Sequence, residues 1–176
     1  MKKLLLLLTA GAMLIACENK KNDDDDKTPA SVTVKMPYTP LYSASFGLGN
    51  PDYATMVVQG SWKDWETNNL DNMKNWIADT IVAFHSDNTM VKGLDSMMAV
   101  WKRARAKYSS SLDSVHAVIP VYSTDKKENW VLIWAGSIGT NLEGKKDTVE
   151  IMETWRINKD GKADMLLQYD RANRKK

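Results

Sequence analysis

The sequence has few of the residues from which proteins build disulfides and metal sites. Its 176 residues include one cysteine, Cys17, and two histidines, His85 and His116, with 30 residues between them. One cysteine excludes an internal disulfide, and two distant histidines do not make a zinc pattern. P-loop, G-x-S-x-G and G-x-G-x-x-G motifs are also missing, which leaves nucleotide cofactors and serine hydrolysis without support. We therefore expect neither a metal nor a cofactor.

An excess of charge of one sign is lacking as well. The chain has 24 basic and 22 acidic residues, and without Lys2 and Lys3 the two numbers are equal. A nucleic-acid binder needs a basic face for its phosphate contacts, so we expect no nucleic-acid partner. No apolar run after residue 16 approaches the roughly 20 residues of a spanning helix. The composition indicates one ordinary domain.

The first 17 residues have the pattern of an export signal. Lys2 and Lys3 precede the apolar run Leu4–Leu8, and a stretch of small residues leads to Leu14-Ile15-Ala16-Cys17. This run resembles a bacterial lipoprotein signal with a lipobox. The resemblance implies that residues 1–16 are removed and that Cys17 is acylated. Two or three acyl chains would hold the protein durably to a membrane that it does not cross.

Residues 17–50 are expected to be the lipidated cysteine and a flexible tether. Residues 18–27 are strongly charged and poor in apolar groups, and residues 28–50, rich in proline and glycine, read as extended chain along the domain surface. The charged run resembles a lysine-plus-acid signal that sends some lipoproteins to the outer surface of the outer membrane; a plain solvated spacer is the alternative. We expect a cell-envelope protein anchored to the outer membrane, either periplasmic or surface-exposed.

Three segments between residues 50 and 108 have the spacing of amphipathic helices. The first begins at Asn50-Pro51-Asp52, where a capping side chain, a proline and an acid suit a helix start. Apolar residues then recur three and four positions apart, which indicates one buried stripe for each helix. The stripes are Ala54, Val57, Val58, Ser61, Trp62 and Trp65; Leu70, Met73, Trp76 and Ile77; and Leu94, Met97, Met98, Trp101, Arg105 and Tyr108.

Strand patterns fill the rest of the domain, which we expect over residues 51–176. Short β-rich runs at 80–85 and 90–92 suit a hairpin between the second and third helices. Four longer runs follow, at 114–123, 129–139, 147–158 and 163–171, and Asp160-Gly161 is a hairpin signal. Helices followed by strands predict an α+β fold in which three N-terminal helices pack on an antiparallel sheet.

Three motifs in this order carry a family resemblance. They are Trp76-Ile77-Ala78-Asp79-Thr80, Val91-Lys92-Gly93-Leu94-Asp95 and the hairpin Trp155-Arg156-Ile157-Asn158-Lys159-Asp160-Gly161-Lys162. With the element layout, they resemble the NTF2-like superfamily, which includes ketosteroid isomerases, scytalone dehydratase and SnoaL-like polyketide cyclases. The resemblance covers roughly residues 52–171. It implies a cone, in which a strongly curved sheet surrounds a pocket that the helices close.

The resemblance also implies two catalytic residues. Ketosteroid isomerases have their base six residues after the alanine-aspartate step, which is His85 in this chain, and an acid at the position of Glu153. The two would act as general base and hydrogen-bond donor. Both residues could instead have a structural role. His85 could be hydrogen-bonded at a strand end, and Glu153 could pair with Arg156 or Arg105. The isomerases' oxyanion tyrosine corresponds to Ser61, so steroid isomerisation as such is not expected.

Seven tryptophans could build a pocket for a flat or apolar ligand. We expect Trp134 and Trp155 to line it, since they lie on strands near Glu153. Trp62 and Trp101, with Ser61, are further ligand-binding candidates, although the tryptophans at helical spacing (Trp62, Trp65, Trp76 and Trp101) also suit a core.

Three functions remain open: a lipid-anchored module that binds a small apolar or aromatic ligand, a cofactor-free cyclase, isomerase or dehydratase that uses His85 and Glu153, and a non-catalytic protein-contact module. The strand at 129–139 is apolar on both faces, with Trp130, Leu132 and Trp134 on one and Val131, Ile133 and Ala135 on the other. Since one face lines the cone, the other is expected to form a homodimer interface. His116 is expected at the sheet surface or in that interface.

Overall fold

The structure is a computed structural model that describes residues 32–33 and 36–172. Its helices lie in the segments where the sequence predicts them. The first expected helix is continuous but changes type along its length, the second is short, and the third is a regular α-helix. The elements are α1 (Pro51–Val57), η1 (Val58–Lys63), α2 (Asp64–Thr67), η2 (Leu70–Asn72), α3 (Met73–Trp76) and α4 (Leu94–Arg105).

The ends of the helices follow from local side-chain chemistry. The side chain of Asn50 accepts a hydrogen bond from the Asp52 amide at 2.9 Å, and Pro51 occupies the first turn of α1. Asn68, with a φ of 59°, ends α2 in the left-handed conformation. Gly93, with a φ of 85°, turns the chain into α4. The helix start expected at Asn50-Pro51-Asp52 is therefore confirmed.

The segment η1 is a π-helix, which the periodicity did not predict. It contains Gly60, Ser61 and Trp62, all of which are buried. A Cβ atom on Gly60 would lie 2.3 Å from the Trp76 ring, so glycine permits close contact between the first helical segment and α3. π-Helical turns occur often at functional sites. Here the turn carries two side chains that line the cavity described below.

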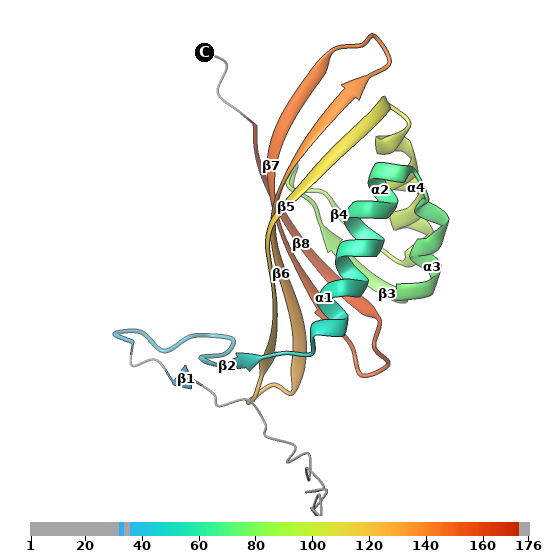
Figure 1. Cartoon of the computed structure of the whole chain (residues 1–176). Helices are drawn as coiled ribbons and strands as arrows, with labels where there is room; N and C mark the ends of the chain where they lie inside the picture. Colours follow the sequence, from blue (N-terminus) through green and yellow to red (C-terminus); the bar gives the residue numbers. More distant parts are fainter. Residues whose placement is uncertain (1–31, 34–35, 173–176) are drawn as a thin grey trace, which may run out of the picture.

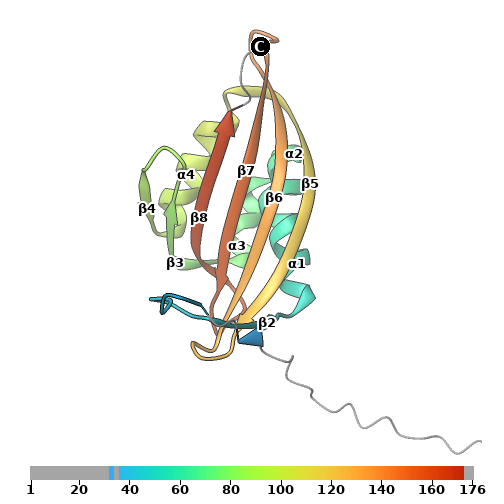
Figure 2. The ribbon, with the colours of Figure 1, turned by 90° about the vertical axis from the view of Figure 1, so that its left-hand side faces the viewer.

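In the described part of the chain, eight strands form one sheet in the order β1-β2-β5-β6-β7-β8-β3-β4. Neighbours pair antiparallel except β3 and β8, which are parallel, so the sheet is mixed rather than wholly antiparallel as expected. The α+β architecture is confirmed (Figures 1 and 2). The strands are β1 (Val32–Thr33), β2 (Ser45–Leu48), β3 (Ile77–Phe84), β4 (Met90–Lys92), β5 (Tyr108–Ser123), β6 (Glu128–Asn141), β7 (Lys146–Ile157) and β8 (Ala163–Ala172).

The helices cover one face of the curved sheet, which we call the inner face (Figure 1). Val131, Trp155 and Leu166 are cross-strand neighbours on this face and have no exposed surface. They pack in one hydrophobic cluster with helical residues such as Val57 and Met97. The core therefore lies between the helices and the inner face, and none of the described helices covers the opposite, outer face.

Part of the expected tether belongs to the sheet. Strand β2 pairs antiparallel with β5, with Phe46 opposite Ser123, and β1 pairs with β2. Tyr42 makes an edge-on contact with Trp130, with ring centres 5.8 Å apart. Residues 42–49 thus lie along the domain surface, as expected for this extended segment, and they are not part of a free tether.

The expected signal peptide and Cys17 lie outside the described residues. Among the residues that are described, no helix is long and apolar enough to cross a membrane.

Candidate functional site

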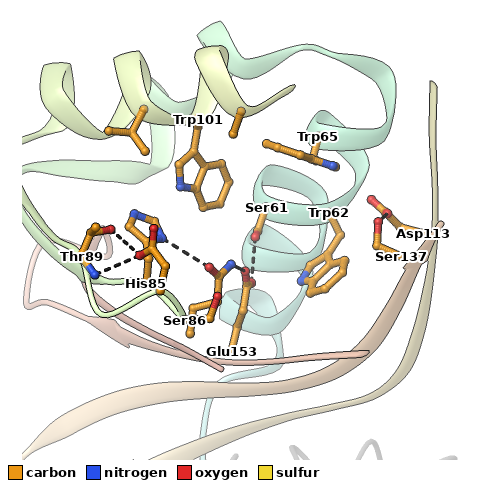
Figure 3. A pocket seen from close by; sticks show the side chains of 14 residues that line it. Ser61, Trp62, Trp65, His85, Ser86, Thr89, Trp101, Asp113, Ser137 and Glu153 are labelled. Atoms are coloured by element: carbon orange, nitrogen blue, oxygen red, sulfur yellow. Dashed lines mark hydrogen bonds between the residues drawn. The ribbon is translucent and has the colours of Figure 1, made fainter. Parts of the chain in front are cut away.

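A cavity of about 260 Å³ lies between the inner face of the sheet and the helices. Aromatic and small apolar side chains come from η1, α2 and α4, and polar side chains come from η1, from the strands and from the β3–β4 turn. Figure 3 shows His85 and Glu153 on one side of the cavity, and Asp113 and Ser137 on the other. The lining residues are Ser61, Trp62, Trp65, His85, Ser86, Asp87, Thr89, Val100, Trp101, Ala104, Asp113, Ser137, Glu153 and Gln168.

Glu153 is a buried carboxyl group whose two oxygens both accept hydrogen bonds. Its Oε2 accepts from Ser61 Oγ and from Trp155 Nε1, each at 2.9 Å, and its Oε1 accepts from Gln168 Nε2 at 3.0 Å. Burial raises the pKa of Glu153, while these three hydrogen bonds and the nearby His85 lower it.

Neither of the two arginines that the sequence offered as partners pairs with Glu153. Arg105 donates to the backbone carbonyls of Trp65, Glu66 and Tyr108. Arg156 is held by Asp164, with Nε 2.8 Å from Oδ1. The hydrogen-bond donors to Glu153 are therefore the neutral groups of Ser61, Trp155 and Gln168.

His85 lies directly after β3 and is linked to Glu153 through one side chain. Its Nδ1 is 3.3 Å from Gln168 Oε1. The backbone amide of His85 donates to the carbonyl of Thr89 at 2.9 Å, which fixes the histidine at the start of the β3–β4 turn. The structure thus brings the two residues expected to be catalytic to the same cavity, with Gln168 between them.

A second carboxyl group, Asp113, stands on the other side of the cavity. Its Oδ1 accepts from Ser137 Oγ at 2.6 Å and from Ser111 Oγ at 3.1 Å. Burial raises the pKa of Asp113, and the two serine hydrogen bonds lower it. The cavity therefore has an acidic residue on each side and tryptophans between them.

Three residues of this lining have a buried polar atom with no hydrogen-bond partner among the described residues. They are Trp62 Nε1, His85 Nε2 and Asp113 Oδ2. Buried polar atoms are normally paired with protein, water or a ligand. The described residues include no group of three or more acidic, histidine or cysteine side chains that could hold a metal ion. The arrangement is thus suited to an organic molecule with a few polar groups.

Solved structures with the same architecture are numerous and distant in sequence. A protein of Jannaschia sp. CCS1 described as a SnoaL-like polyketide cyclase aligns with 77% of this chain and 91% of its own, at 12% identity and a TM-score of 0.56. An NTF2-like protein of unknown function from Burkholderia pseudomallei aligns with 69% of this chain and 91% of its own, at 15% identity and a TM-score of 0.54. The chain has the NTF2-like fold.

An epoxide hydrolase of Mycobacterium tuberculosis, described as LEH-like, is a further neighbour of this NTF2-like domain. It aligns with 68% of this chain and 84% of its own, at 12% identity and a TM-score of 0.54. No model of a known protein family matches the sequence, and no curated protein matches it. The likeness establishes the fold, which hosts many activities, so function has to be argued from the site.

The two tryptophans expected to line the pocket lie elsewhere in the NTF2-like domain. Trp134 is on the outer face, where it borders a shallow pocket with His116 and Tyr169. Trp155 is on the inner face but is fully buried in the core, where its ring packs against those of Trp76 and Trp101. The expectation that these two line the cavity is therefore wrong, whereas Ser61, Trp62 and Trp101 do line it.

The error with Trp134 has a simple cause. Ile133 pairs with Glu153, so the inner face of β6 is the one with Val131, Ile133 and Ala135. Alternation within a strand that is apolar on both faces cannot tell which face is inner, because a shift of one residue exchanges the two. The structure also places His116 at the outer surface, with a half-exposed side chain whose Nδ1 is 3.7 Å from Glu150 Oε2.

Several lining residues were not expected from the sequence. Gln168 and Asp113 are polar residues within strands, and each would also suit a solvent-facing position. Gln168 lies two positions after Leu166 on β8, so both side chains are on the same face of the sheet, and Leu166 is fully buried. This alternation was the one feature of the sequence that could have indicated Gln168. Trp65 was assigned to the core, and its Nε1 in fact donates to Ser111 Oγ at 3.2 Å beside Asp113.

The outer face also has a larger hollow, which we call the outer groove and which is separate from the shallow pocket beside Trp134. It has a volume of about 560 Å³ and an almost wholly apolar lining. Residues of the segment before α1 form one wall, and side chains of β5 to β8 form the floor. The lining consists of Tyr42, Phe46, Val121, Trp130, Leu132, Thr154, Arg156, Met165 and Leu167.

Proposed function

We propose that the cavity binds a small, flat and mainly apolar molecule with a few polar groups. Trp62, Trp65 and Trp101 offer ring surfaces, and Val100 and Ala104 complete the apolar wall. Aromatic side chains give a large apolar contact area and prefer offset or edge-on packing with other rings. The volume of about 260 Å³ is below the range of roughly 300–1,000 Å³ for sites of drug-sized ligands, so the molecule is small.

The observation that carries this proposal is the grouping of unpaired polar atoms around one cavity. An indole donor, an imidazole nitrogen and a carboxylate oxygen belong to residues that line it. Leaving such atoms unpaired costs about 1–3 kcal/mol each. A chain that only needed a filled core would place apolar atoms there instead. A ligand with matching polar groups would recover this free energy on binding.

The test is the binding of 2-naphthol, measured by calorimetry, to two matched variants. Ala104→Phe fills the cavity, and Thr154→Phe places the same side chain in the outer groove. We expect 2-naphthol to bind the parent and Thr154→Phe equally, and to bind Ala104→Phe at least tenfold more weakly. Circular dichroism checks that both variants fold. Loss of binding only in Thr154→Phe would move the ligand to the outer groove and contradict the proposal.

A second candidate function is proton transfer with His85 as the base. The protein would then be a cofactor-free cyclase, isomerase or dehydratase. This function is favoured by the Nε2 atom of His85, which has no partner among the described residues. Both oxygens of Glu153 already accept hydrogen bonds from the protein, so we do not assign it a direct contact with the substrate. Glu153 would instead hold His85 in position through Gln168. Exchange of the α-protons of 2-tetralone in heavy water tests this function. Activity that His85→Ala abolishes would support it, and equal rates with and without protein would contradict it.

Two further proposals concern the setting of the domain and rest on the sequence patterns. Acylation of Cys17 would anchor the protein in the cell envelope, and Cys17→Ser should release it from membranes. A homodimer through the outer face would cover the apolar side chains of the outer groove. Leu132→Glu should then shift sedimentation from dimer to monomer, whereas a monomeric parent would contradict the dimer.

A further inference from the structure

His85, Gln168 and Glu153 are consecutive along a line that crosses three strands. Glu153 on β7 is the direct cross-strand partner of Gln168 on β8. Strand β8 runs parallel to β3, with Leu167 beside Phe84, so the residues that follow each of them, Gln168 and His85, are also neighbours. The pairing of three strands therefore brings an acid, an amide and an imidazole together.

The hydrogen bonds of Glu153 decide how the Gln168 amide is oriented. Trp155 Nε1 can only donate, and it is directed at Glu153 Oε2 together with the Ser61 hydroxyl. Gln168 Nε2 donates to Glu153 Oε1 at 3.0 Å, so the NH₂ group of Gln168 faces the carboxyl group. The other end of the amide, the Oε1 oxygen, then faces His85 Nδ1 at 3.3 Å.

The orientation of the amide in turn decides which nitrogen of His85 carries the proton. An amide oxygen can only accept, so the neutral imidazole has to donate from Nδ1. Its lone pair is then on Nε2, which is buried and has no partner among the described residues. In general, a hydrogen bond from a neighbouring group to one ring nitrogen fixes the tautomer of a histidine.

We propose that Gln168, held by Glu153, is a positioning residue that keeps His85 in the Nδ1–H tautomer, so that the cavity requires a hydrogen-bond donor from its ligand at Nε2. This inference rests on the proposed ligand-binding function and narrows the ligand class. Trp62 Nε1 can only donate and takes an acceptor. The ligand is therefore a small flat compound that has a hydroxyl or N–H group for His85 and an oxygen acceptor for Trp62.

The tautomer can be measured without any ligand, by nitrogen NMR of the imidazole rings. Protonated and unprotonated ring nitrogens have well-separated shifts, and the spectra are recorded at a pH above which these shifts no longer change, so that the ring is neutral. His116→Gln, on the outer surface, leaves His85 as the single histidine. We expect Nδ1 to be protonated and Nε2 unprotonated in this background. An Nε2–H signal would overturn the proposal.

Glu153→Gln tests whether the hydrogen bonding of residue 153 determines the tautomer of His85 through the Gln168 amide. The new carbonyl oxygen would keep the hydrogen bonds from Ser61 and Trp155, and its NH₂ group would face Gln168. Gln168 would then turn its oxygen towards residue 153 and its NH₂ towards His85, which forces the proton from Nδ1 to Nε2. Reversal of the tautomer supports the relay. An Nδ1–H tautomer that persists in Glu153→Gln and in Gln168→Leu would overturn it.

Measurements of ligand binding can contradict the tautomer inference and the proposed function independently of each other. Calorimetry compares 2-naphthol, which can donate, with 2-methoxynaphthalene, which cannot. We expect the parent to bind 2-naphthol about tenfold more tightly, as the net value of one hydrogen bond allows, and Glu153→Gln to lose this preference. Equal binding of the two probes would overturn the inference but not the proposed function. Binding of neither probe would contradict the proposed function, and the nitrogen shifts would still decide the tautomer.

Discussion

Two adjacent rows of residues cross the same strands, and they differ in what covers them. The row Val131, Trp155 and Leu166 on the inner face is completely buried under the helices. The next row, Leu132, Thr154 and Leu167, lines the outer groove. Both rows are largely apolar, so hydrophobicity alone does not decide which face becomes the core. The decision lies in where the helices dock.

The two faces also differ in their polar chemistry. The inner face contains Glu153, whose two oxygens accept three hydrogen bonds, and the cavity beside it includes unpaired polar atoms. The outer groove has Arg156 as its one charged residue, and Asp164 already binds it. A specific ligand is therefore better served by the cavity, whereas the outer groove offers non-directional apolar contact.

The largest expected effect comes from exchanging one tryptophan on each face for alanine. Trp155→Ala removes a fully buried ring and one of the donors to Glu153, and should cost about 3–5 kcal/mol of unfolding free energy. Trp134→Ala removes a partly exposed ring and should cost about 1 kcal/mol or less. Urea unfolding of both variants measures the difference. A larger cost for Trp134→Ala would mean that the outer face is covered in solution.

A pair of glycines gives a smaller effect of the same kind. An added methyl group on Gly60 would meet the Trp76 ring at 2.3 Å inside the core, and such overpacking costs about 1–3 kcal/mol. On Gly136 the nearest atoms would be side-chain atoms of Glu150 and His116 at 3.5 Å, which is an ordinary contact. Gly60→Ala should therefore lower the thermal midpoint clearly more than Gly136→Ala. Equal midpoints would show that α3 can move away from η1 without cost.

The fold could be predicted because its signals are local. Asn50 and Pro51 start a helix, Gly93 leads into α4, and Asp160-Gly161 closes a hairpin, and each acts through neighbours in sequence. The π-helical turn could not be predicted in the same way, because no local pattern in the sequence marks it. Its Gly60 lies against Trp76, which is 16 positions further along the chain.

The site was predictable only where the family resemblance fixes a position. His85 and Glu153 were named from such positions, and the structure places both at the cavity. Gln168 joins them through the register of β7 with β8 and of β8 with β3, which no single segment contains. Trp134 was misplaced for the same reason, since only the pairing of Ile133 with Glu153 shows which side of β6 is inner.

The smallest expected effect is a pH dependence that belongs to the inner face. Burial raises the pKa of Glu153 in the folded state above its ordinary value of 4.5, so the folded chain holds a proton that the unfolded chain has lost. Stability should therefore fall as the pH rises from about 4.5 to the raised pKa, with a slope of at most about 1.4 kcal/mol per pH unit for one proton, and then level off.

Glu153→Gln removes this contribution, and the exposed Glu143→Gln is the matched control. The difference between the parent and Glu153→Gln isolates Glu153 from Asp113, whose pKa burial also raises, and from the exposed acids whose pKa values are lowered. We expect urea unfolding at a series of pH values to show a flatter decline for Glu153→Gln and an unchanged one for Glu143→Gln. Parallel curves for the parent and Glu153→Gln would mean that the three donors offset the burial of the carboxylate fully, and that Glu153 stays ionised throughout this range.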